Sequence, residues 1–515
     1  MNHFTEGDLQ QAATLGITPK QLQQQLNNFR QGFAKTELTR AATVQNGGIR
    51  RLEEADIDRY VSAYEESIAG GLRPLKFVPA SGAATRMFKD LYEFSSKYFG
   101  IDYSVASDYP SVREFLEHIR SFAFFDDLQA CMQRSACDFG DYMTRGDFAT
   151  VINFLLKEQY LGYGSLPKAL IKFHRYGSLQ RTPLEEHIVE GAEYARTATD
   201  EVYLHFTVSP EHHRLFTSKI ASIRKYYEDA LGVKLHIALS EQKHYTDTLA
   251  VDEYNNPVRD EAGHLVFRPG GHGALIENLG ECNADIIFIK NIDNVVPDWM
   301  KHTTTVYKKA LAGLLVEVQQ QVFAHLRALA SHPEASHIAA AATFASDQLH
   351  LHLPADFGAL PLAEQCKQLT ALLHRPIRVC GMVRNQGEPG GGPFFVRNSQ
   401  QQETLQIVET AQINTKSPAQ NDILNHATHF NPVDLVCATK DHRGRRFDLH
   451  QYVDYNTGFI SKKTKGAQTV KSQELPGLWN GSMAHWITLF VEVPLATFNP
   501  VKTVNDLLRK EHLEG

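Results

Sequence analysis

Short apolar runs alternate with longer amphipathic stretches along most of the chain. A stretch of the second kind follows Pro210 and predicts a helix to about Leu231. Strands that alternate with helices are typical of a parallel sheet with helices on both faces. The pattern therefore predicts an α/β fold around a mixed, mostly parallel sheet. The runs predicted as strands are residues 76–80, 202–208, 234–239, 284–290, 377–383 and 486–493.

Helical patterns lie before, within and after these runs. Amphipathic stretches after Pro19 and from Glu53 to Ile68 predict a helical N-terminal segment, and a long helix is predicted from Thr304 to Ala328. A stretch rich in Phe, Tyr and Asp predicts a mostly helical insertion at about residues 92–160. We therefore divide the chain into a helical segment 1–70, a first core half 71–300 with the insertion, a helical segment 301–375 and a second core half 376–515.

Composition narrows the class of protein. The chain has 515 residues, 43% of them hydrophobic, and a net charge of -7, which does not indicate a nucleic-acid or membrane partner. Six cysteines without a C-x-x-C pair favour a reducing compartment. The N-terminus lacks the pattern of a signal peptide, and no window approaches ~18 consecutive apolar residues. These features predict a cytoplasmic protein.

A loop of small residues follows the first predicted strand. Such residues let backbone N–H groups approach phosphate oxygens, and the start of the next helix adds partial positive charge. The guanidinium group of Arg86 is a planar donor for phosphate. The loop indicates a phosphate site, with an ordinary strand-to-helix turn as the alternative. Its residues are Ala80, Ser81, Gly82, Ala83, Ala84 and Thr85.

Two further turns place polar side chains where a ligand could bind. Lys168 stands between a Gly/Pro turn and an apolar run. His272 is flanked by Gly271 and Gly273, which permit close approach of the backbone to a base or a sugar. A lone lysine is usually a solvated surface residue and glycine-rich turns are common, so neither turn defines a site by itself.

Two more charged residues complete the set. Asp293 comes just after the run 284–290, at the carboxyl end of a strand, where ligands bind in open α/β sheets. Its carboxylate can hold Mg²⁺ against phosphate oxygens, or cap the helix that follows. Lys502 lies in Pro500-Val501-Lys502-Thr503 before a predicted C-terminal helix, and taken alone it is a surface lysine.

Taken in their order along the chain, from about residue 75 to 508, these stretches resemble the motifs of the sugar-1-phosphate nucleotidyltransferases of the UDP-sugar pyrophosphorylase type. The whole chain resembles the DUF4301 family. The resemblance implies a GT-A fold with a nucleotide-binding half at 71–300 and a sugar-binding half at 376–515. The matching stretches are Gly82–Arg86, Pro167–Leu170, Thr182–Glu185, Pro269–Gly273, Asp293-Asn294, Pro500–Thr503 and Asp506–Leu508.

The reaction implied joins a nucleoside triphosphate, UTP by analogy with the uridylyl branch, to a sugar 1-phosphate and releases pyrophosphate. The resemblance gives Arg86, Lys168 and Lys502 catalytic roles and makes Asp293 the Mg²⁺ ligand. It assigns the nucleotide to Ala80, Ser81, Gly82, Ala83, Thr85, Gly271, His272 and Gly273.

Two loops of the C-terminal third are candidate sugar contacts. The loop after the run 377–383 offers Glu388 and Gly390, with a long flexible loop as the alternative. The stretch 475–482 offers Asn480, with a structural turn as the alternative.

The sequence departs from the family in three ways. Ala84 stands where a second glycine is usual, and about 80 residues separate Arg86 from Lys168, where the family has far fewer. The second metal-binding carboxylate is not identified; the candidates are Asp434, Asp448 and Asp454.

Other classes of function stay open. A GT-A glycosyltransferase would usually carry an Asp-x-Asp pair, but Asn291 stands two residues before Asp293. A nucleotide-binding protein without catalytic activity would suit Ala84 and the insertion. A separate metal site is also open, with a polar loop as its alternative; its residues would be His426, His429, His442 and Asp434.

Overall fold

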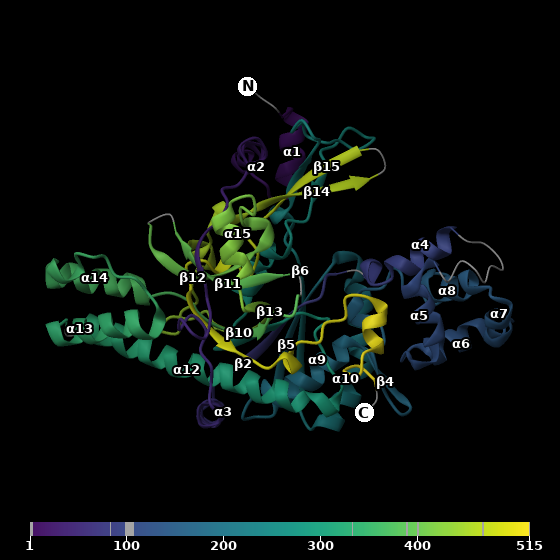
Figure 1. Cartoon of the computed structure of the whole chain (residues 1–515), viewed down its shortest axis with the longest axis horizontal. Helices are drawn as coiled ribbons and strands as arrows, with labels where there is room; N and C mark the ends of the chain where they lie inside the picture. The colour runs from purple at the N-terminus through teal and green to yellow at the C-terminus, as the bar shows by residue number, and fades with distance from the viewer. Residues whose placement is uncertain are drawn as a thin grey trace. The chain divides into compact units, whose positions relative to one another are not determined.

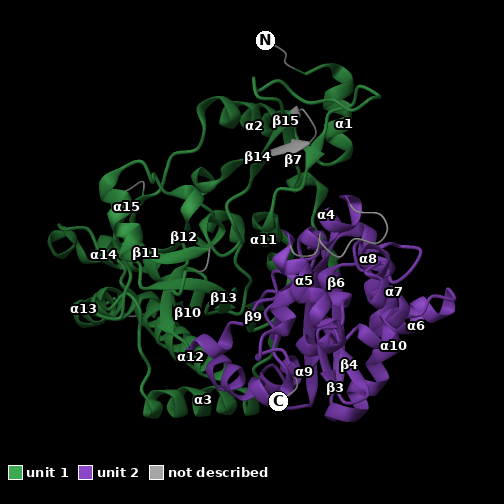
Figure 2. Cartoon of the chain, turned by 45° about the vertical axis from the view of Figure 1, so that its right-hand side comes forward, with its two compact units in different colours: residues 1–74, 240–289, 309–493 green, residues 75–239, 290–308, 494–515 purple. Residues whose placement is uncertain are grey.

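The computed structural model describes residues 4–82, 84–97, 108–331, 333–387, 390–398, 401–465 and 468–513. The chain divides into two compact units (Figure 2). Unit 1 comprises residues 1–74, 240–289 and 309–493, and unit 2 comprises 75–239, 290–308 and 494–515. Each unit is thus assembled from segments that lie far apart in the sequence.

Seven strands form the largest sheet, in the order β16-β10-β13-β9-β2-β5-β6. Figure 1 labels β10, β13, β2, β5 and β6 of this sheet. The pairs β2–β5 and β10–β16 are parallel, whereas β10 and β13 are antiparallel. The predicted α/β fold with a mixed, mostly parallel sheet is confirmed, and all six predicted strands belong to this sheet. The strands are β2 (Pro74–Pro79), β5 (Glu201–Val208), β6 (Lys234–Glu241), β9 (Ile286–Lys290), β10 (Ile377–Arg384), β13 (His429–Ala438) and β16 (Ile487–Glu492).

Unit 2 contains a hairpin, β3 (His174–Tyr176) and β4 (Leu179–Arg181), and a set of helices. Thr182 caps helix α9, and Glu185 bonds back to the Thr182 N–H, which completes a capping box. The stretch Thr182–Glu185 is therefore a helix start. The helices are α4 (Lys89–Lys97), α5 (Pro110–Glu117), α6 (Phe125–Arg134), α7 (Phe139–Arg145), α8 (Phe148–Leu156), α9 (Pro183–Tyr194) and α10 (His213–Leu231).

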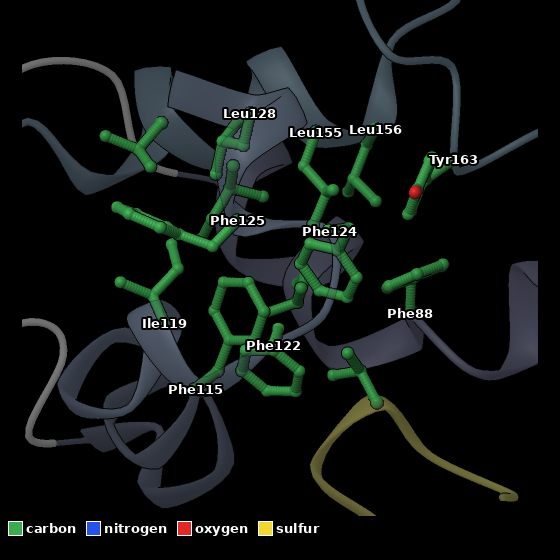
Figure 3. Close-up of a cluster of buried hydrophobic side chains, with 14 of the residues drawn as sticks. Phe88, Phe115, Ile119, Phe122, Phe124, Phe125, Leu128, Leu155, Leu156 and Tyr163 are labelled. Carbon is green, nitrogen blue, oxygen red and sulfur yellow. The ribbon is translucent and has the colours of Figure 1, made fainter. Parts of the chain in front are cut away.

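An aromatic cluster forms the core of the insertion in unit 2 (Figure 3). The rings of Phe115 and Phe124 lie 5.0 and 4.9 Å from that of Phe122, and Tyr163 meets Phe124 edge to face at 5.3 Å. The C-terminal chain, yellow in Figure 3, runs along this cluster and contributes side chains to it. The insertion therefore covers one face of the segment that carries Lys502. The contributing side chains are Val501, Val504 and Leu507.

Unit 1 holds two smaller sheets, β1-β11-β12 and β14-β15-β7-β8, besides its part of the large one. Helix α12 (Lys301–Ser331) continues from residues of unit 2 into those of unit 1. No helix in the described part of the chain is both long and apolar enough to cross a membrane. The remaining elements are α1 (Glu6–Thr14), α2 (Pro19–Gln31), β1 (Glu37–Ala41), α3 (Glu54–Ala69), β7 (Thr248–Val251), β8 (Phe267–Arg268), α11 (Ile276–Glu281), α13 (Ala335–Thr343), α14 (Leu362–Leu373), β11 (Gly391–Arg397), β12 (Glu403–Glu409), α15 (Pro418–Asn425), β14 (Phe459–Lys465) and β15 (Gln468–Glu474).

One prediction for the N-terminal segment is wrong. Residues 1–70 are not helical throughout, because β1 lies between α2 and α3 and pairs antiparallel with β11. Only Leu38 and Ala41 of β1 are buried, and the pairing with β11 shifts register between Leu38 and Arg40. Five residues with this burial give neither a clear helical nor a clear strand period in the sequence.

Candidate functional site

The small-residue loop of unit 2 begins where β2 ends. Ala80 is buried, and its N–H donates to a carbonyl of β5 (N···O 2.9 Å). A Cβ placed on Gly82 would meet no atom within 4 Å, so this side of the loop faces open space. A phosphate group could approach the backbone there. Ser81, Gly82 and Thr85 are exposed, and Ala83 lies outside the described residues.

Ala84, which replaces the usual second glycine, has a defined place in the fold. It is fully buried and opens the 3₁₀ turn Ala84–Arg86, and its N–H donates to the Leu166 carbonyl (3.1 Å). A methyl side chain is therefore accommodated here, and the backbone of the loop is tied to the segment that leads to Lys168.

Lys168 joins the loop to Asp293. Its backbone N–H donates to the Gly82 carbonyl (3.3 Å). Its Nζ donates to Asp293 Oδ2 and to the Val501 carbonyl, both at 2.8 Å. The Lys168 and Asp293 side chains are 15% and 22% exposed, so solvent and small ligands can reach them. Three stretches that the sequence singled out are adjacent in unit 2.

The chain around Lys502 is held on both sides. The Val501 N–H donates to the Asp293 carbonyl and the Val504 N–H to the Met87 carbonyl, each at 3.1 Å. The side chains of Lys502 and of Arg86, the neighbour of Met87, are exposed. Within the described ranges, neither side chain makes a hydrogen bond or an ion pair. Unit 2 therefore presents two unpaired cations on segments that meet at the Lys168–Asp293 pair.

Asp293 fits a role as a single protein ligand for Mg²⁺. Its Oδ1 accepts no hydrogen bond from the residues described, while Oδ2 binds Lys168. Among those residues, no group of three His, Cys, Asp or Glu side chains could hold a metal. Mg²⁺ commonly takes one or two carboxylates together with substrate phosphates. A bound nucleotide would have to complete such a site.

A buried charge cluster supports the segments that lead to the loop and to Asp293. Glu190 on α9 binds Lys76 Nζ at 2.9 Å and Lys290 Nζ at 2.8 Å, and all three side chains are at most 1% exposed. Burial alone would raise the pKa of Glu190, but Lys290 and Lys76 hold it well below its usual value. Burial lowers the pKa of Lys76 to about 7. The Glu190 carboxylate is therefore the shared ion-pair partner of two ammonium groups.

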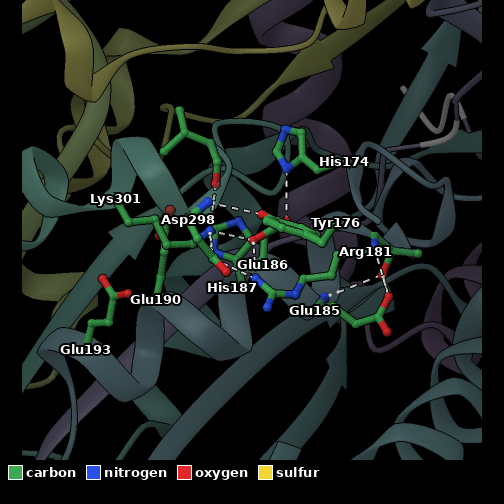
Figure 4. A network of polar contacts seen from close by, with 12 residues as sticks. His174, Tyr176, Arg181, Glu185, Glu186, His187, Glu190, Glu193, Asp298 and Lys301 are labelled. Carbon is green, nitrogen blue, oxygen red and sulfur yellow. Dashed lines mark hydrogen bonds and ion pairs between the residues drawn. The ribbon is translucent and has the colours of Figure 1, made fainter. Parts of the chain in front are cut away.

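A second carboxylate of α9, Glu186, binds several donors (Figure 4). His174 Nδ1 lies at 2.9 Å, the Tyr176 hydroxyl at 2.8 Å and Lys301 Nζ at 2.6 Å. Burial would raise the pKa of Glu186, but Lys301 and His174 lower it to about 2. His174 Nε2 lies 2.9 Å from His512 Nδ1, so this network also holds the end of the C-terminal segment.

Neither network was predicted from the sequence, although the sequence contains a signal for both. Lys76 and Lys290 lie within apolar runs that predicted buried strands, and a buried ammonium group needs a partner. Glu186 and Glu190 are four residues apart and so lie on one face of α9. Charges at predicted buried positions were the clue.

Unit 1 brings the predicted base-contacting loop to Asn480. The His272 ring stacks on Trp479 with centroids 4.3 Å apart, and its Nδ1 accepts from the Leu478 N–H (3.0 Å). Asn480 Nδ2 donates to Glu409 Oε1 at 2.6 Å, and His272 Nε2 lies 3.6 Å from that oxygen. Asn480 is only 2% exposed, so its amide nitrogen is committed to the fold.

The backbone conformation and the packing of this loop require glycine at two positions. Gly271 has a φ of +78°, and a Cβ on Gly273 would lie 2.1 Å from the Pro476 carbonyl oxygen. The close approach that Gly273 permits is taken up by protein backbone. Of the predicted sugar contacts, Gly390 is exposed beside β11, and Glu388 lies outside the described residues.

The separate metal site that the sequence left open in the C-terminal third is not formed by the described residues. In the part of the chain that the structure covers, no three side chains of the right kind gather to hold a metal. His429 begins β13 and binds Glu492 (3.2 Å), and His426 ends α15, where its Nδ1 contacts the Asp422 carbonyl (2.7 Å). The proposed ligands were His426, His429, His442 and Asp434.

The candidates for a second Mg²⁺ carboxylate have local roles. Asp448 and Asp454 each cap a short 3₁₀ turn, where they accept bonds from the N–H groups of His450 and Asn456. Asp434 is 1% exposed within β13. The second ligand stays unassigned.

The comparisons with known proteins assign a family. The chain belongs to the DUF4301 family, described as "Domain of unknown function (DUF4301)", whose model matches residues 5–513. The predicted membership is confirmed. No curated protein matches the chain.

Solved structures similar to the chain include mutants of UDP-glucose pyrophosphorylase from Leishmania major. One is 11% identical, with 94% of this chain and 73% of that chain covered and a TM-score of 0.42. Another, in complex with UDP-glucose, is also 11% identical, with 98% and 78% covered and a TM-score of 0.43. A likeness at this level carries no argument about the activity of this chain.

Proposed function

We propose that this protein is a nucleotidyltransferase that joins a nucleoside triphosphate, UTP in the first instance, to a sugar 1-phosphate and releases pyrophosphate. The observation that carries the proposal is the meeting within unit 2 of the loop at Gly82, the Lys168–Asp293 pair and the Lys502 segment. The order of these motifs in the sequence, which resembles that of the sugar-1-phosphate nucleotidyltransferases, supports it.

The reaction requires charge rather than a nucleophilic side chain. An oxygen of the sugar 1-phosphate attacks the α-phosphorus, the bond from that phosphorus to the bridging oxygen breaks, and pyrophosphate leaves. Both reactants are anions, so the protein must offset their repulsion, align them and stabilise the charge on the phosphorus oxygens. Arg86 would bind the β- and γ-phosphates, and Lys168 and Lys502 the α-phosphate and the sugar phosphate.

Lys168 is placed to bind a phosphate without leaving its present partners. An ammonium group has three N–H donors. Asp293 and the Val501 carbonyl take two of them, so the third is available to a ligand. Asp293 would hold Mg²⁺ through its other carboxylate oxygen, and the ion, when bound, would offset phosphate charge.

The resemblance also assigns substrate contacts to residues of unit 1. We assign the base to the loop Gly271–Gly273 and the sugar to Glu388, Gly390 and Asn480. The Asn480 nitrogen binds Glu409 and its oxygen is buried without a partner among the described residues, so a sugar hydroxyl would reach that oxygen only if the turn opens.

The test is pyrophosphate release from UTP and Mg²⁺ with a panel of sugar 1-phosphates. Lys168→Met should lower kcat by about 10²-fold or more, because it removes charge that acts on the transferred phosphorus. Lys172→Met is the matched control, since Lys172 lies four residues on and pairs with Asp127 instead (2.6 Å). Its kcat should stay close to the wild-type value.

The alternatives give different results. If UTP with Mg²⁺ raises the melting temperature but no sugar 1-phosphate yields pyrophosphate, the protein binds nucleotide without this catalysis. If instead a nucleotide sugar loses its sugar to an acceptor without pyrophosphate formation, the protein is a glycosyltransferase. Equal activity of Lys168→Met and the control would refute the role of Lys168.

A further inference from the structure

Unit 1 contains a cavity of about 360 Å³ that the proposed reaction does not use. Arg375, two residues before β10, and Trp486, one residue before β16, both line it. The cavity is therefore at the amino ends of these two strands, whereas ligands of open α/β sheets bind at the carboxyl ends. None of the residues assigned above to nucleotide, sugar or metal lines it.

Two donors at this cavity have unused hydrogen-bonding capacity. Trp486 is 3% exposed, and its indole N–H finds no acceptor among the described residues. Arg375 donates through Nε to the Ala371 carbonyl (3.3 Å) and makes no ion pair within the ranges described. A buried donor without an acceptor is costly, so a ligand or water that supplies one would stabilise the fold.

The rest of the lining gives the cavity a positive balance. Glu403 is the one carboxylate among the described lining residues, and Arg40 neutralises it at 2.7 Å. Burial lowers the pKa of His485 below its usual value; the charge of Asp454 opposes this shift and that of Arg375 adds to it, so the imidazole is mostly neutral near pH 7. Amide side chains complete the wall. They belong to Asn398, Gln402, Gln406 and Gln451.

We propose that this cavity binds a small organic anion, with its phosphate or carboxylate group on Arg375 and the indole N–H of Trp486. Hydroxyl groups of the same ligand would bind the amides and the His485 imidazole. A guanidinium group suits both kinds of anion, and the volume lies in the range of small-molecule sites. The proposal does not depend on the reaction assigned to the protein.

Trp486 itself supplies the reporter. The chain has three tryptophans, so Trp299→Phe combined with Trp479→Phe leaves Trp486 as the only indole. Glucose 6-phosphate, citrate and inorganic phosphate are titrated against this variant. We expect a saturable fluorescence change with glucose 6-phosphate or with citrate. The ligand that binds with the higher affinity shows whether the site prefers a phosphate or a carboxylate group. Inorganic phosphate should bind about 10-fold more weakly, because it lacks the hydroxyl-bearing body.

Arg375→Gln in this background should weaken binding about 10-fold or more. Lys367→Gln is the control, because it removes the same charge at a residue of α14 that does not line the cavity. Either of two results overturns the proposal. One is the absence of a saturable fluorescence change up to about 10 mM ligand, which corresponds to negligible affinity. The other is equal binding by Arg375→Gln and the control. If Arg375→Gln fails to fold, Trp486→Phe replaces it: the melting-temperature increase caused by the better ligand should shrink, and an unchanged increase overturns the proposal.

Discussion

Glu190→Gln is the substitution that tests most directly how the small-residue loop after β2 and Asp293 are supported. Glu190 is fully buried and binds Lys76 and Lys290 at 2.9 and 2.8 Å. Lys308, also fully buried, lies 5.9 Å from the ring of Tyr194, the residue whose hydroxyl donates to Glu190. The neutral amide would leave the buried ammonium groups of this cluster without their shared counter-charge.

The expected cost follows from that geometry. Breaking a buried ion pair by removing one partner costs about 3–5 kcal/mol. For a unit of about 200 residues, each kcal/mol corresponds to roughly 2–4 °C in melting temperature, so the transition should fall by roughly 6–20 °C. Lys76→Met should cost much less, within about 1 kcal/mol, because Glu190 keeps Lys290 as a one-to-one partner and a desolvated charge is removed.

Differential scanning calorimetry of the two variants gives the measurement. Glu193→Gln is the control, since Glu193 is on the same helix but exposed, and its change should stay within about 0.5 kcal/mol. The reasoning fails if Glu190→Gln is as stable as the control, or if Lys76→Met costs as much as Glu190→Gln.

Two further predictions concern the site, and a third concerns the buried cluster. Asp293→Asn should abolish pyrophosphate release while lowering the melting temperature by only about 2–4 °C, because its partly exposed pair with Lys168 is worth about 1 kcal/mol; loss of folding would mark Asp293 as structural. Lys502→Ala should lower kcat about 10²-fold with little change in UTP affinity. The control Lys510→Ala, which removes a 90% exposed side chain, should leave kcat unchanged. Equal kcat values for the two variants would refute the role of Lys502. The pKa of Lys76 falls to about 7 in the folded state, so above pH 7 the unfolded chain binds more protons than the folded one. The free energy of unfolding, measured in urea, should therefore rise from pH 7 to 9 by at most about 1.4 kcal/mol per pH unit. Lys76→Met should flatten that rise, and an equally steep rise in the variant would contradict the prediction.

Each strand that the sequence predicted is a short, mostly apolar run with at most two polar or charged residues. Strand β13 was missed although all ten of its residues are buried. His429, Asn431 and Asp434 interrupt its apolar pattern, and Pro432 argues against a central strand. Polar side chains that find buried partners, such as His429 with Glu492, do not show those partners in the sequence.

The candidate site was predictable as a set of motifs but not as an arrangement. The order of the motifs marked Lys168, Asp293 and Lys502, yet nothing local to Lys168 indicates that it binds the Val501 carbonyl, more than 300 residues further on. The same limit applies to Asn480. Its turn predicted a sugar contact, whereas its amide nitrogen binds Glu409 within the fold.

The position of the Lys502 segment has a consequence for synthesis of the chain. A ribosome makes residues 75–239 of unit 2 well before residues 494–515, and the long stretch 309–493 of unit 1 comes between. Until the last segment emerges, the aromatic cluster lacks Val501, Val504 and Leu507, and Lys168 lacks the Val501 carbonyl. A nascent chain in which residues 494–515 are not yet made therefore leaves this apolar face of the cluster uncovered.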